Sequence, residues 1–234
     1  MLKDILKNIE NADTQSEPYE HLIVDNLLPS DFYQRLAFDL EAERFEEYIR
    51  GEYGNKERFG VDITDYGSWE NSKKNLATKI HDHNYNSLAK DSSLKVFFDL
   101  LLENKKDFYS ALCKKLRTTK HKDNYFFHTS MVKDSLGYKI EKHTDFEQNI
   151  FTALFYAPQT DINKEFGLHV YKDAVTEDGV KLLDFIPNRM VAFAPCEENK
   201  DRPPTWHEVR RLSDELVGTR NSFQMFFYKN ESGE

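Results

Sequence analysis

The chain has 234 residues, 39% of them apolar and 14% aromatic, which suits one folded domain over 1–234 and excludes a disordered chain. Its formal net charge of −9 disfavours nucleic acid as a partner, because sequence-independent binding to nucleic acid needs a broad basic surface. No stretch approaches the ~18 consecutive apolar residues that cross a bilayer, so we expect no membrane partner and a cytoplasmic location.

Helical patterns dominate the first part of the chain, and we expect residues 1–120 to form a supporting region of helices and loops. Ser30 is a suitable N-cap for a helix over 31–48. Ser92 or Ser93 is a suitable cap for a second helix, which continues or restarts through 108–116.

The rest of this region carries one early strand, His21–Val24, and a stretch rich in Gly, Asn, Asp and Ser over 51–75 that we interpret as loop. Cys113 and Cys196 are too few for a disulfide framework, and reduced thiols are the simpler interpretation than a bridge. We interpret a run of basic residues as the solvated face of a helix rather than as a patch that attracts an anionic substrate. Its members are Lys105, Lys106, Lys114, Lys115, Arg117, Lys120 and Lys122.

Short strands follow over 121–230, rich in Phe, Tyr, Val, Ile and Leu and separated by Pro, Gly and Asn. This spacing favours an antiparallel sandwich or jelly roll over a parallel sheet with crossover helices. The expected strands are 124–133, 137–142, 149–157, 167–171, 181–186, 189–194, 206–212 and 220–229.

A candidate metal site begins with His143-Thr144-Asp145, at the end of one expected strand. Residues i and i+2 of an extended segment point to the same side, so His143 and Asp145 can both face one ion. His207, at the start of another expected strand, supplies a third ligand. Two histidines and one carboxylate leave open coordination positions, an arrangement typical of non-haem Fe(II) oxygenases.

Arg220 and Ser222 open the last expected strand and share one face of it. A guanidinium can fork onto a carboxylate, and a hydroxyl can add a third hydrogen bond. This pair is therefore suited to the far carboxylate of a dicarboxylate that chelates the metal through its keto-acid end. Arg210 and Arg211 are rivals that rank lower, since they follow His207 on its own strand.

The region 125–229 resembles the 2-oxoglutarate/Fe(II)-dependent oxygenase superfamily, especially the branch similar to prolyl 4-hydroxylases, while 21–36 matches only loosely. The stretches that carry the resemblance, in the order of the family, are VKDSLGYKIEKHTD (132–145), TALFYAP (152–158), FGLHVYKD (166–173), FIPNRMVAFAP (185–195), WHEV (206–209) and RNSFQMFFY (220–228).

The resemblance implies a mainly β fold, the double-stranded β-helix or jelly roll, behind N-terminal helices. It also implies Fe(II) on His143, Asp145 and His207, and 2-oxoglutarate as a cosubstrate with O2, with its distal carboxylate on Arg220 and Ser222. Ascorbate is a further candidate reductant. The implied activity is hydroxylation of a C–H bond in a peptidyl (prolyl-type), carbohydrate or small-molecule substrate.

Gly137 matches a glycine common in this region of the family, but two other positions differ from the pattern. Related hydroxylases often carry a tyrosine where this chain has Asp134, and Gly-Gly or Gly-Thr where it has Phe166-Gly167. The hydroxyl that completes the cosubstrate site is therefore open. The candidates are Tyr125, Tyr138 and Tyr156.

Several other residues have two interpretations. His81-Asp82-His83 is a second potential metal pair, but its polar surroundings favour a solvated loop. His128 and His169 either line a substrate cavity or pack in the sheets. Trp206 belongs either to the core or to the wall of the site.

The stripe Phe223, Met225 and Phe227 is predicted to be core. Two other classes of protein compete with the oxygenase: a jelly-roll binding protein without catalysis, and a cupin-type metalloenzyme that does not use 2-oxoglutarate. Substrate choice is expected to lie in the loops 51–75, 159–165 and 196–205.

Overall fold

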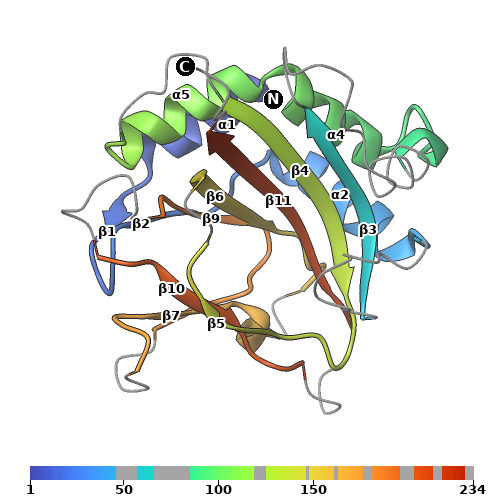
Figure 1. Cartoon of the computed structure of the whole chain (residues 1–234). Helices are drawn as coiled ribbons and strands as arrows, with labels where there is room; N and C mark the ends of the chain where they lie inside the picture. The colour runs from blue at the N-terminus through green and yellow to red at the C-terminus, as the bar shows by residue number, and fades with distance from the viewer. Residues whose placement is uncertain are drawn as a thin grey trace, which may run out of the picture.

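Two antiparallel sheets face each other in the computed structural model, and helices cover the outer side of the larger sheet (Figure 1). The structure describes residues 1–45, 57–65, 85–118, 125–145, 148–160, 163–175, 181–195, 203–212 and 218–229. The chain is mainly β, as the sequence predicts.

The major sheet has seven strands in the order β1-β2-β9-β6-β11-β4-β3. Their bounds are β1 Thr14–Gln15, β2 His21–Val24, β3 Arg58–Asp65, β4 Tyr125–Asp134, β6 Asn149–Tyr156, β9 Arg189–Phe193 and β11 Arg220–Lys229. The minor sheet has four strands in the order β5-β10-β7-β8. Their bounds are β5 Ile140–His143, β7 Leu168–Tyr171, β8 Lys181–Leu183 and β10 Trp206–Val209, with a 3-10 turn, η2 Lys164–Phe166, before β7.

Successive side chains of β11 point to opposite faces of the major sheet, and each face packs into a different hydrophobic core. Phe223, Met225 and Phe227 are fully buried on the side that faces the helices, which confirms the predicted core stripe. Ser222 and its neighbours in register point instead into the space between the two sheets. We call this side of the major sheet its inner face.

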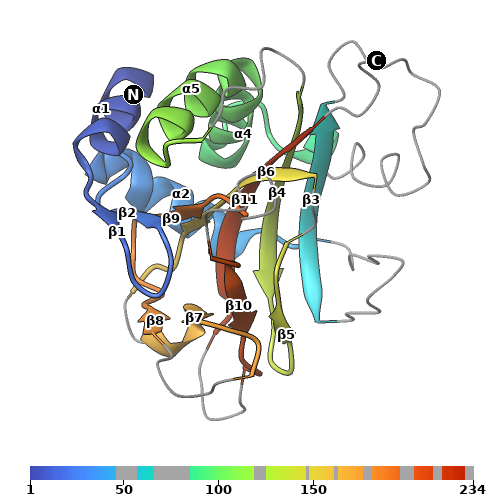
Figure 2. The same cartoon turned by 60° about the vertical axis from the view of Figure 1, so that its left-hand side comes forward.

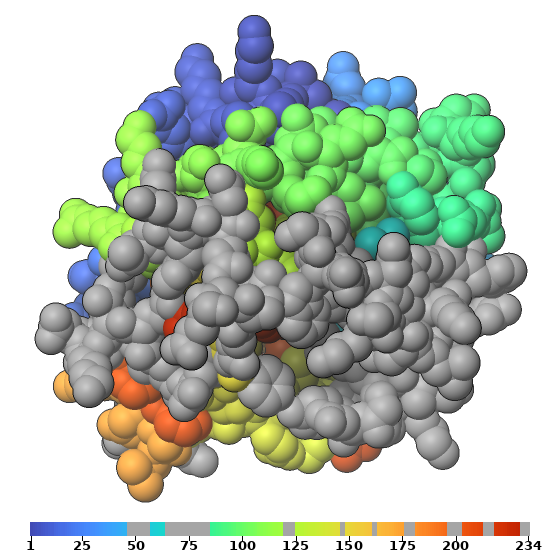
Figure 3. All heavy atoms as spheres, turned by 45° about the horizontal axis from the view of Figure 1, so that its top comes forward, coloured from blue at the N-terminus to red at the C-terminus, as the bar shows by residue number. Residues whose placement is uncertain are grey.

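The helical layer consists of α1 Leu2–Asn11, α2 Ser30–Ala42, α4 Ser93–Glu103 and α5 Lys105–Lys115. These helices gather on one side of the molecule, as the blue and green atoms show (Figure 3), while the minor sheet lies on the opposite side of the major sheet (Figure 2). Phe97 of α4 packs edge-on against Phe223, with ring centroids 4.8 Å apart. Helices and major sheet thus share one apolar core. None of the described helices has the length and apolar character needed to cross a membrane.

The helix after residue 30 differs from the prediction at both ends. Its N-cap is Pro29, whose carbonyl accepts the first helical bond from Tyr33, so Ser30 lies inside the helix. It ends at Ala42, and the ammonium of Lys133 binds the carbonyls of Glu41 and Glu43 at 2.8 and 3.2 Å. A contact remote in sequence thus satisfies the carbonyls at this helix end.

The second predicted helix is confirmed with a break. Ser92, one of the two candidate caps, accepts a hydrogen bond from the Lys95 amide at 3.2 Å and starts α4. The chain restarts as α5 at Asn104. The Nζ atoms of Lys114 and Lys115 bind Glu10 of α1, which agrees with a solvated helix face. Lys120 and Lys122 lie outside the described residues.

All eight strands predicted after residue 120 are present, with ends shifted by a few residues, and β2 has the predicted bounds. The interpretation of 51–75 as loop was wrong for 58–65, which form β3 and pair with the whole of β4 from Asp134 to Phe127. The sequence also missed β1 and α1. In α1, Ile5 and Ile9 are fully buried against the helical core.

Candidate metal centre

The three predicted metal ligands meet between the sheets. β5 and β10 are antiparallel neighbours, and His143 at the end of β5 is directly paired with His207 of β10. Asp145 Oδ1 lies 3.8 Å from His143 Nε2 and 3.7 Å from His207 Nε2. One ligand atom from each of the three residues lies within 4.8 Å of the other two, a spacing that suits a single ion.

Both imidazoles are oriented by the backbone. His143 Nδ1 is 2.8 Å from the carbonyl of Glu141, and His207 Nδ1 is 2.8 Å from the carbonyl of Thr205. A carbonyl oxygen can accept a hydrogen bond but cannot donate one. Nδ1 therefore carries the hydrogen in each ring, and the Nε2 lone pair is left for a metal. Burial lowers the pKa of His207, and the neighbouring His143 lowers it further while Asp145 opposes them. A neutral His207 is the form that binds metal.

Two residues of β6 orient the carboxylate of Asp145 through hydrogen bonds. Thr152 donates its hydroxyl proton to Asp145 Oδ2, and Asn149 Nδ2 donates to the same oxygen at 3.2 Å. Asn149 also donates to Thr152 Oγ1 at 2.6 Å. These bonds leave Oδ1, the oxygen nearest both histidines, as the ligand atom. The donor set fits a divalent metal such as Fe(II).

Replacing Thr152 by Val tests this support without changing the side chain's shape. We expect Fe(II) affinity to fall by about 10- to 100-fold, the usual effect of losing a partner of a metal ligand. Anaerobic titration calorimetry measures it. Thr129→Val is the matched control, since the buried Thr129 hydroxyl bonds the Gln224 carbonyl on the helix-facing side of the major sheet. Equal losses in the two variants would contradict a role for Thr152 in orienting Asp145.

Arg220 lies on the inner face, where the sequence places it, and its side chain is only 1% exposed. Its Nε donates to the carbonyl of Phe166 at 2.7 Å, and Nη1 donates to Asp134 Oδ2 at 3.0 Å. A guanidinium has five N–H groups, so three remain for other acceptors. The η2 turn that supplies Phe166 sits close to β8 because Gly167 lacks a Cβ, which would lie 2.0 Å from the Leu183 carbonyl oxygen.

Several hydroxyls between the sheets are buried without a hydrogen-bond partner among the described residues. They include those of Ser222 and Tyr156, each 0% exposed, and that of Tyr19, which is 1% exposed. Burying an unsatisfied hydroxyl is costly, so such groups commonly mark a place where a ligand binds. Their position fits a carboxylate-bearing cosubstrate.

Aromatic rings lie beside the metal ligands and beside Arg220. The Phe193 ring lies 4.9 Å from that of His207, and Tyr19 packs edge-on against Phe193 at 5.9 Å. Burial raises the pKa of Tyr19 well above its usual value, and the nearby Asp145 and Tyr156 raise it further. Tyr156 in turn lies under the Arg220 guanidinium, with Cζ 5.7 Å from the ring centroid. Tyr19 and Tyr156 therefore line the space between metal and guanidinium.

The three candidate tyrosines lie at different positions relative to Arg220. Tyr125 does not reach the site. It is the first residue of β4, whereas Asp134 is the last, and its ring stacks on Tyr109 on the helix-facing side of the sheet, with centroids 4.1 Å apart. Tyr138 is buried in the core between the sheets, beside the Arg58 guanidinium at 4.4 Å. Tyr156 is the candidate next to Arg220. Tyr19 was not foreseen, because nothing in its local sequence marks it.

Of the remaining candidates, His128, His169 and Arg210 are not part of the three-ligand cluster. His128 is on the inner face of β4, with Nε2 2.7 Å from Asp62 Oδ1. His169 alternates with Leu168 and Val170 of the inter-sheet core, so it points out of the space between the sheets. Arg210 donates to Glu208 at 2.9 Å on the outer side of the minor sheet.

Arg211 is exposed, and Trp206 occupies the opposite side of β10 from His207. The remaining candidates, His81-Asp82-His83 and Cys196, lie outside the described residues. Gly137, which precedes β5, has φ +90°, a backbone conformation that favours glycine.

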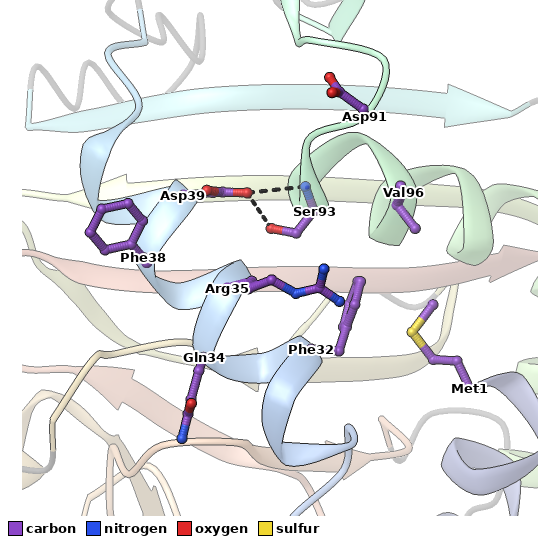
Figure 4. A pocket seen from close by; sticks show the side chains of 9 residues that line it. All are labelled: Met1, Phe32, Gln34, Arg35, Phe38, Asp39, Asp91, Ser93 and Val96. Atoms are coloured by element: carbon purple, nitrogen blue, oxygen red, sulfur yellow. Dashed lines mark hydrogen bonds between the residues drawn. The ribbon is translucent and has the colours of Figure 1, made fainter.

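A separate hollow of about 530 Å³ opens between α2 and α4. Phe38, Arg35 and Val96 are among its lining residues, and Asp39 accepts hydrogen bonds from Ser93 at its edge (Figure 4). It lies in the helical layer, on the other side of the major sheet from the metal centre. It takes no part in the candidate site.

No family model matches the sequence, and no curated protein does. Solved structures do align with it. One is an oxidoreductase of the 2OG-Fe(II) oxygenase family from Burkholderia pseudomallei, with a TM-score of 0.55 and 12% identity over 95% of this chain and 89% of that one. Another is JOX2 in complex with 2OG, Fe and JA, with a TM-score of 0.51 and 12% identity over 91% of this chain and 68% of that one.

A prolyl-4-hydroxylase from Pseudomonas putida aligns over 98% of this chain and 99% of that one, with 14% identity and a TM-score of 0.49. The structures above 0.5 show that this chain has the fold of the 2OG-Fe(II) oxygenases, the double-stranded β-helix expected from the sequence. Within that fold, the chain carries a His-Asp-His cluster able to hold a metal ion.

Proposed function

We propose that this protein is an Fe(II)- and 2-oxoglutarate-dependent hydroxylase. The observation that supports it is a combination in the space between the two sheets: a three-ligand cluster, and a buried guanidinium beside unpartnered hydroxyls. A binding protein without catalysis needs neither part, and a metalloenzyme that does not use 2-oxoglutarate has no need of the guanidinium.

Each residue has a separate task. His143, Asp145 and His207 hold the metal, and Arg220 with Ser222 binds the distal carboxylate of 2-oxoglutarate. Phe193, Tyr19 and the other aromatic residues between them exclude water. The bound metal supplies O2 activation, with electrons from decarboxylation of 2-oxoglutarate. One oxygen atom goes to succinate and the other to the hydroxylated product, and CO2 is released.

The substrate is proposed to approach over the inner face on the β4 side of the metal. Thr152, which binds Asp145, is paired in register with Phe226 of β11, and Phe226 with His128 of β4. Phe226 also lies parallel to Tyr228, with centroids 5.9 Å apart. A peptidyl prolyl-type residue, a carbohydrate and a small metabolite remain the candidate substrate classes. The cytoplasmic location stays a prediction, as does a role for ascorbate.

An anaerobic titration of metal-free protein with Fe(II) and 2-oxoglutarate tests the proposal. We expect a visible charge-transfer band that requires both components and saturates at one equivalent of Fe(II). Substrate candidates are then compared by succinate formation above the uncoupled background. No band at any concentration of 2-oxoglutarate, with Fe(II) still bound, would favour a cupin-type metalloenzyme, and no Fe(II) binding at all would favour a binding protein.

A further inference from the structure

Tyr19 is a buried tyrosine whose hydroxyl has no hydrogen-bond partner in the part of the chain that the structure describes, although the residue is only 1% exposed. Two other buried tyrosines differ from it. The hydroxyl of Tyr33 donates to the carbonyl of Pro158, and that of Tyr171 donates to the carboxylate of Glu208. An unpaired buried hydroxyl is unfavourable for folding, so the Tyr19 hydroxyl indicates a partner that is not part of the protein.

The Tyr19 ring is held close to the metal ligands. Its carbonyl oxygen lies 2.8 Å from Nδ1 of His21, at the start of β2. His21 is paired in register with Phe193 of β9, and the Tyr19 ring packs edge-on against both rings, with centroids 5.9 Å apart in each case. The Phe193 ring in turn lies 4.9 Å from that of His207. One aromatic ring therefore separates Tyr19 from a metal ligand.

The register of the major sheet places this contact at the metal end of the proposed cosubstrate site. Phe193 is paired with Thr152 of β6, which donates its hydroxyl proton to the metal ligand Asp145. Tyr156, beside the buried guanidinium, lies four residues further along β6, which is about 13 Å of strand. Tyr19 thus packs on the row of inner-face residues that supports the metal, not on the row beside the guanidinium.

Building on the proposed hydroxylase function, we propose that the Tyr19 hydroxyl donates a hydrogen bond to the keto-acid end of 2-oxoglutarate, the end that binds the metal. Burial, and then the nearby Asp145, raise the pKa of Tyr19, so the phenol keeps its proton and can donate it. Tyr19 lies outside the region 125–229, so the resemblance does not imply this contact. Arg220 and Ser222 bind the distal carboxylate, whereas Tyr19 binds the part that all 2-oxo acids share.

Replacing Tyr19 by Phe removes the donor and keeps the ring. 2-Oxovalerate has the same keto-acid end as 2-oxoglutarate but no distal carboxylate, and we expect both to bind about 10- to 100-fold more weakly, as for the loss of a hydrogen bond to a charged group. Affinity for Fe(II) alone should equal that of wild type, since the three ligands are unchanged. The measurement is the anaerobic charge-transfer band, which is independent of turnover.

The position of the band provides a second readout. A hydrogen bond to the chelating group lowers the energy of the ligand orbital that accepts the electron from Fe(II). Losing the bond in Tyr19→Phe should therefore move the band to shorter wavelength with either keto acid. A residue that only fills space would leave the wavelength unchanged.

Tyr33→Phe is the matched control, because its hydroxyl bonds the Pro158 carbonyl and its ring belongs to the helix-facing core. This variant should melt at a lower temperature than wild type, with unchanged keto-acid affinities and an unchanged band. Metal-free Tyr19→Phe is expected to show the opposite pattern. It should melt at or above the wild-type temperature, because no hydrogen bond of the fold is lost and an unsatisfied hydroxyl is removed.

Three results for Tyr19→Phe would overturn the inference. The first is wild-type affinity for both keto acids with an unshifted band. The second is a loss confined to 2-oxoglutarate, which would place the contact at the distal carboxylate. The third is an equal loss of Fe(II) affinity, which would show an indirect effect through the metal ligands. All three leave the proposed function standing, whereas absence of the band in wild-type protein counts against the function itself.

Discussion

His207→Ala is expected to lose tight Fe(II) binding and, with it, succinate production. The side chain supplies one of three ligand atoms, and its Nε2 lone pair is set by the Nδ1 contact with the Thr205 carbonyl. Losing a ligand outright should weaken Fe(II) by more than the ~10- to 100-fold that follows loss of a ligand's partner. Anaerobic calorimetry and a succinate assay measure the two effects, and Asp145→Ala is expected to behave alike.

His169→Ala is the matched control for this experiment. His169 is also a buried histidine of the minor sheet, on the strand next to β10, but it points out of the space between the sheets. Its replacement should cost stability without changing Fe(II) affinity. Near-wild-type Fe(II) affinity and succinate production in His207→Ala would refute the assignment of the triad.

Arg220→Met should weaken 2-oxoglutarate binding by on the order of 100-fold, because a two-pronged charge-assisted contact is lost. Affinity for 2-oxovalerate should not change, so the preference for the dicarboxylate should collapse. The variant is expected to fold, since Asp134 keeps its fork to Arg58 and no buried carboxylate is left alone. The band titration and a thermal melt provide the two measurements.

Arg220→Lys refines the same experiment. It keeps the charge but loses the fork, so its preference for 2-oxoglutarate should lie between those of wild type and Arg220→Met. An Arg220→Met protein that still prefers 2-oxoglutarate over 2-oxovalerate as strongly as wild type would show that the distal carboxylate binds elsewhere. Arg220 would then be a structural partner of Asp134 alone.

Much of the fold was predictable because its signals are local. Alternation of apolar residues located the strands from β4 onward, and Phe223, Met225 and Phe227 identified the core-facing side of β11. The same alternation placed His143 with Asp145, and Arg220 with Ser222, on shared faces. These inferences need only the period of a strand and the chemistry of the side chains.

Two missed elements carried weaker local signals. In β3, Phe59, Val61 and Ile63 alternate with polar residues, but polar and Gly-rich neighbours on both sides favoured a loop. In α1, Ile5 and Ile9 stand one helical turn apart in a short, highly charged segment. Pairing with β4 and packing against α5 stabilise these segments, and neither contact is visible in the local sequence.

The sequence by itself determined the class of fold, the three metal ligands as candidates and the guanidinium on the last strand. Only the tertiary structure decided which residues support them. Thr152 behind Asp145, Tyr19 between metal and guanidinium, and Arg58 across Asp134 come from segments that the chain brings together over long separations. Strand period is a local property of the chain, whereas the register that pairs Arg58, Asp134 and Arg220 is set by the packing of the whole sheet.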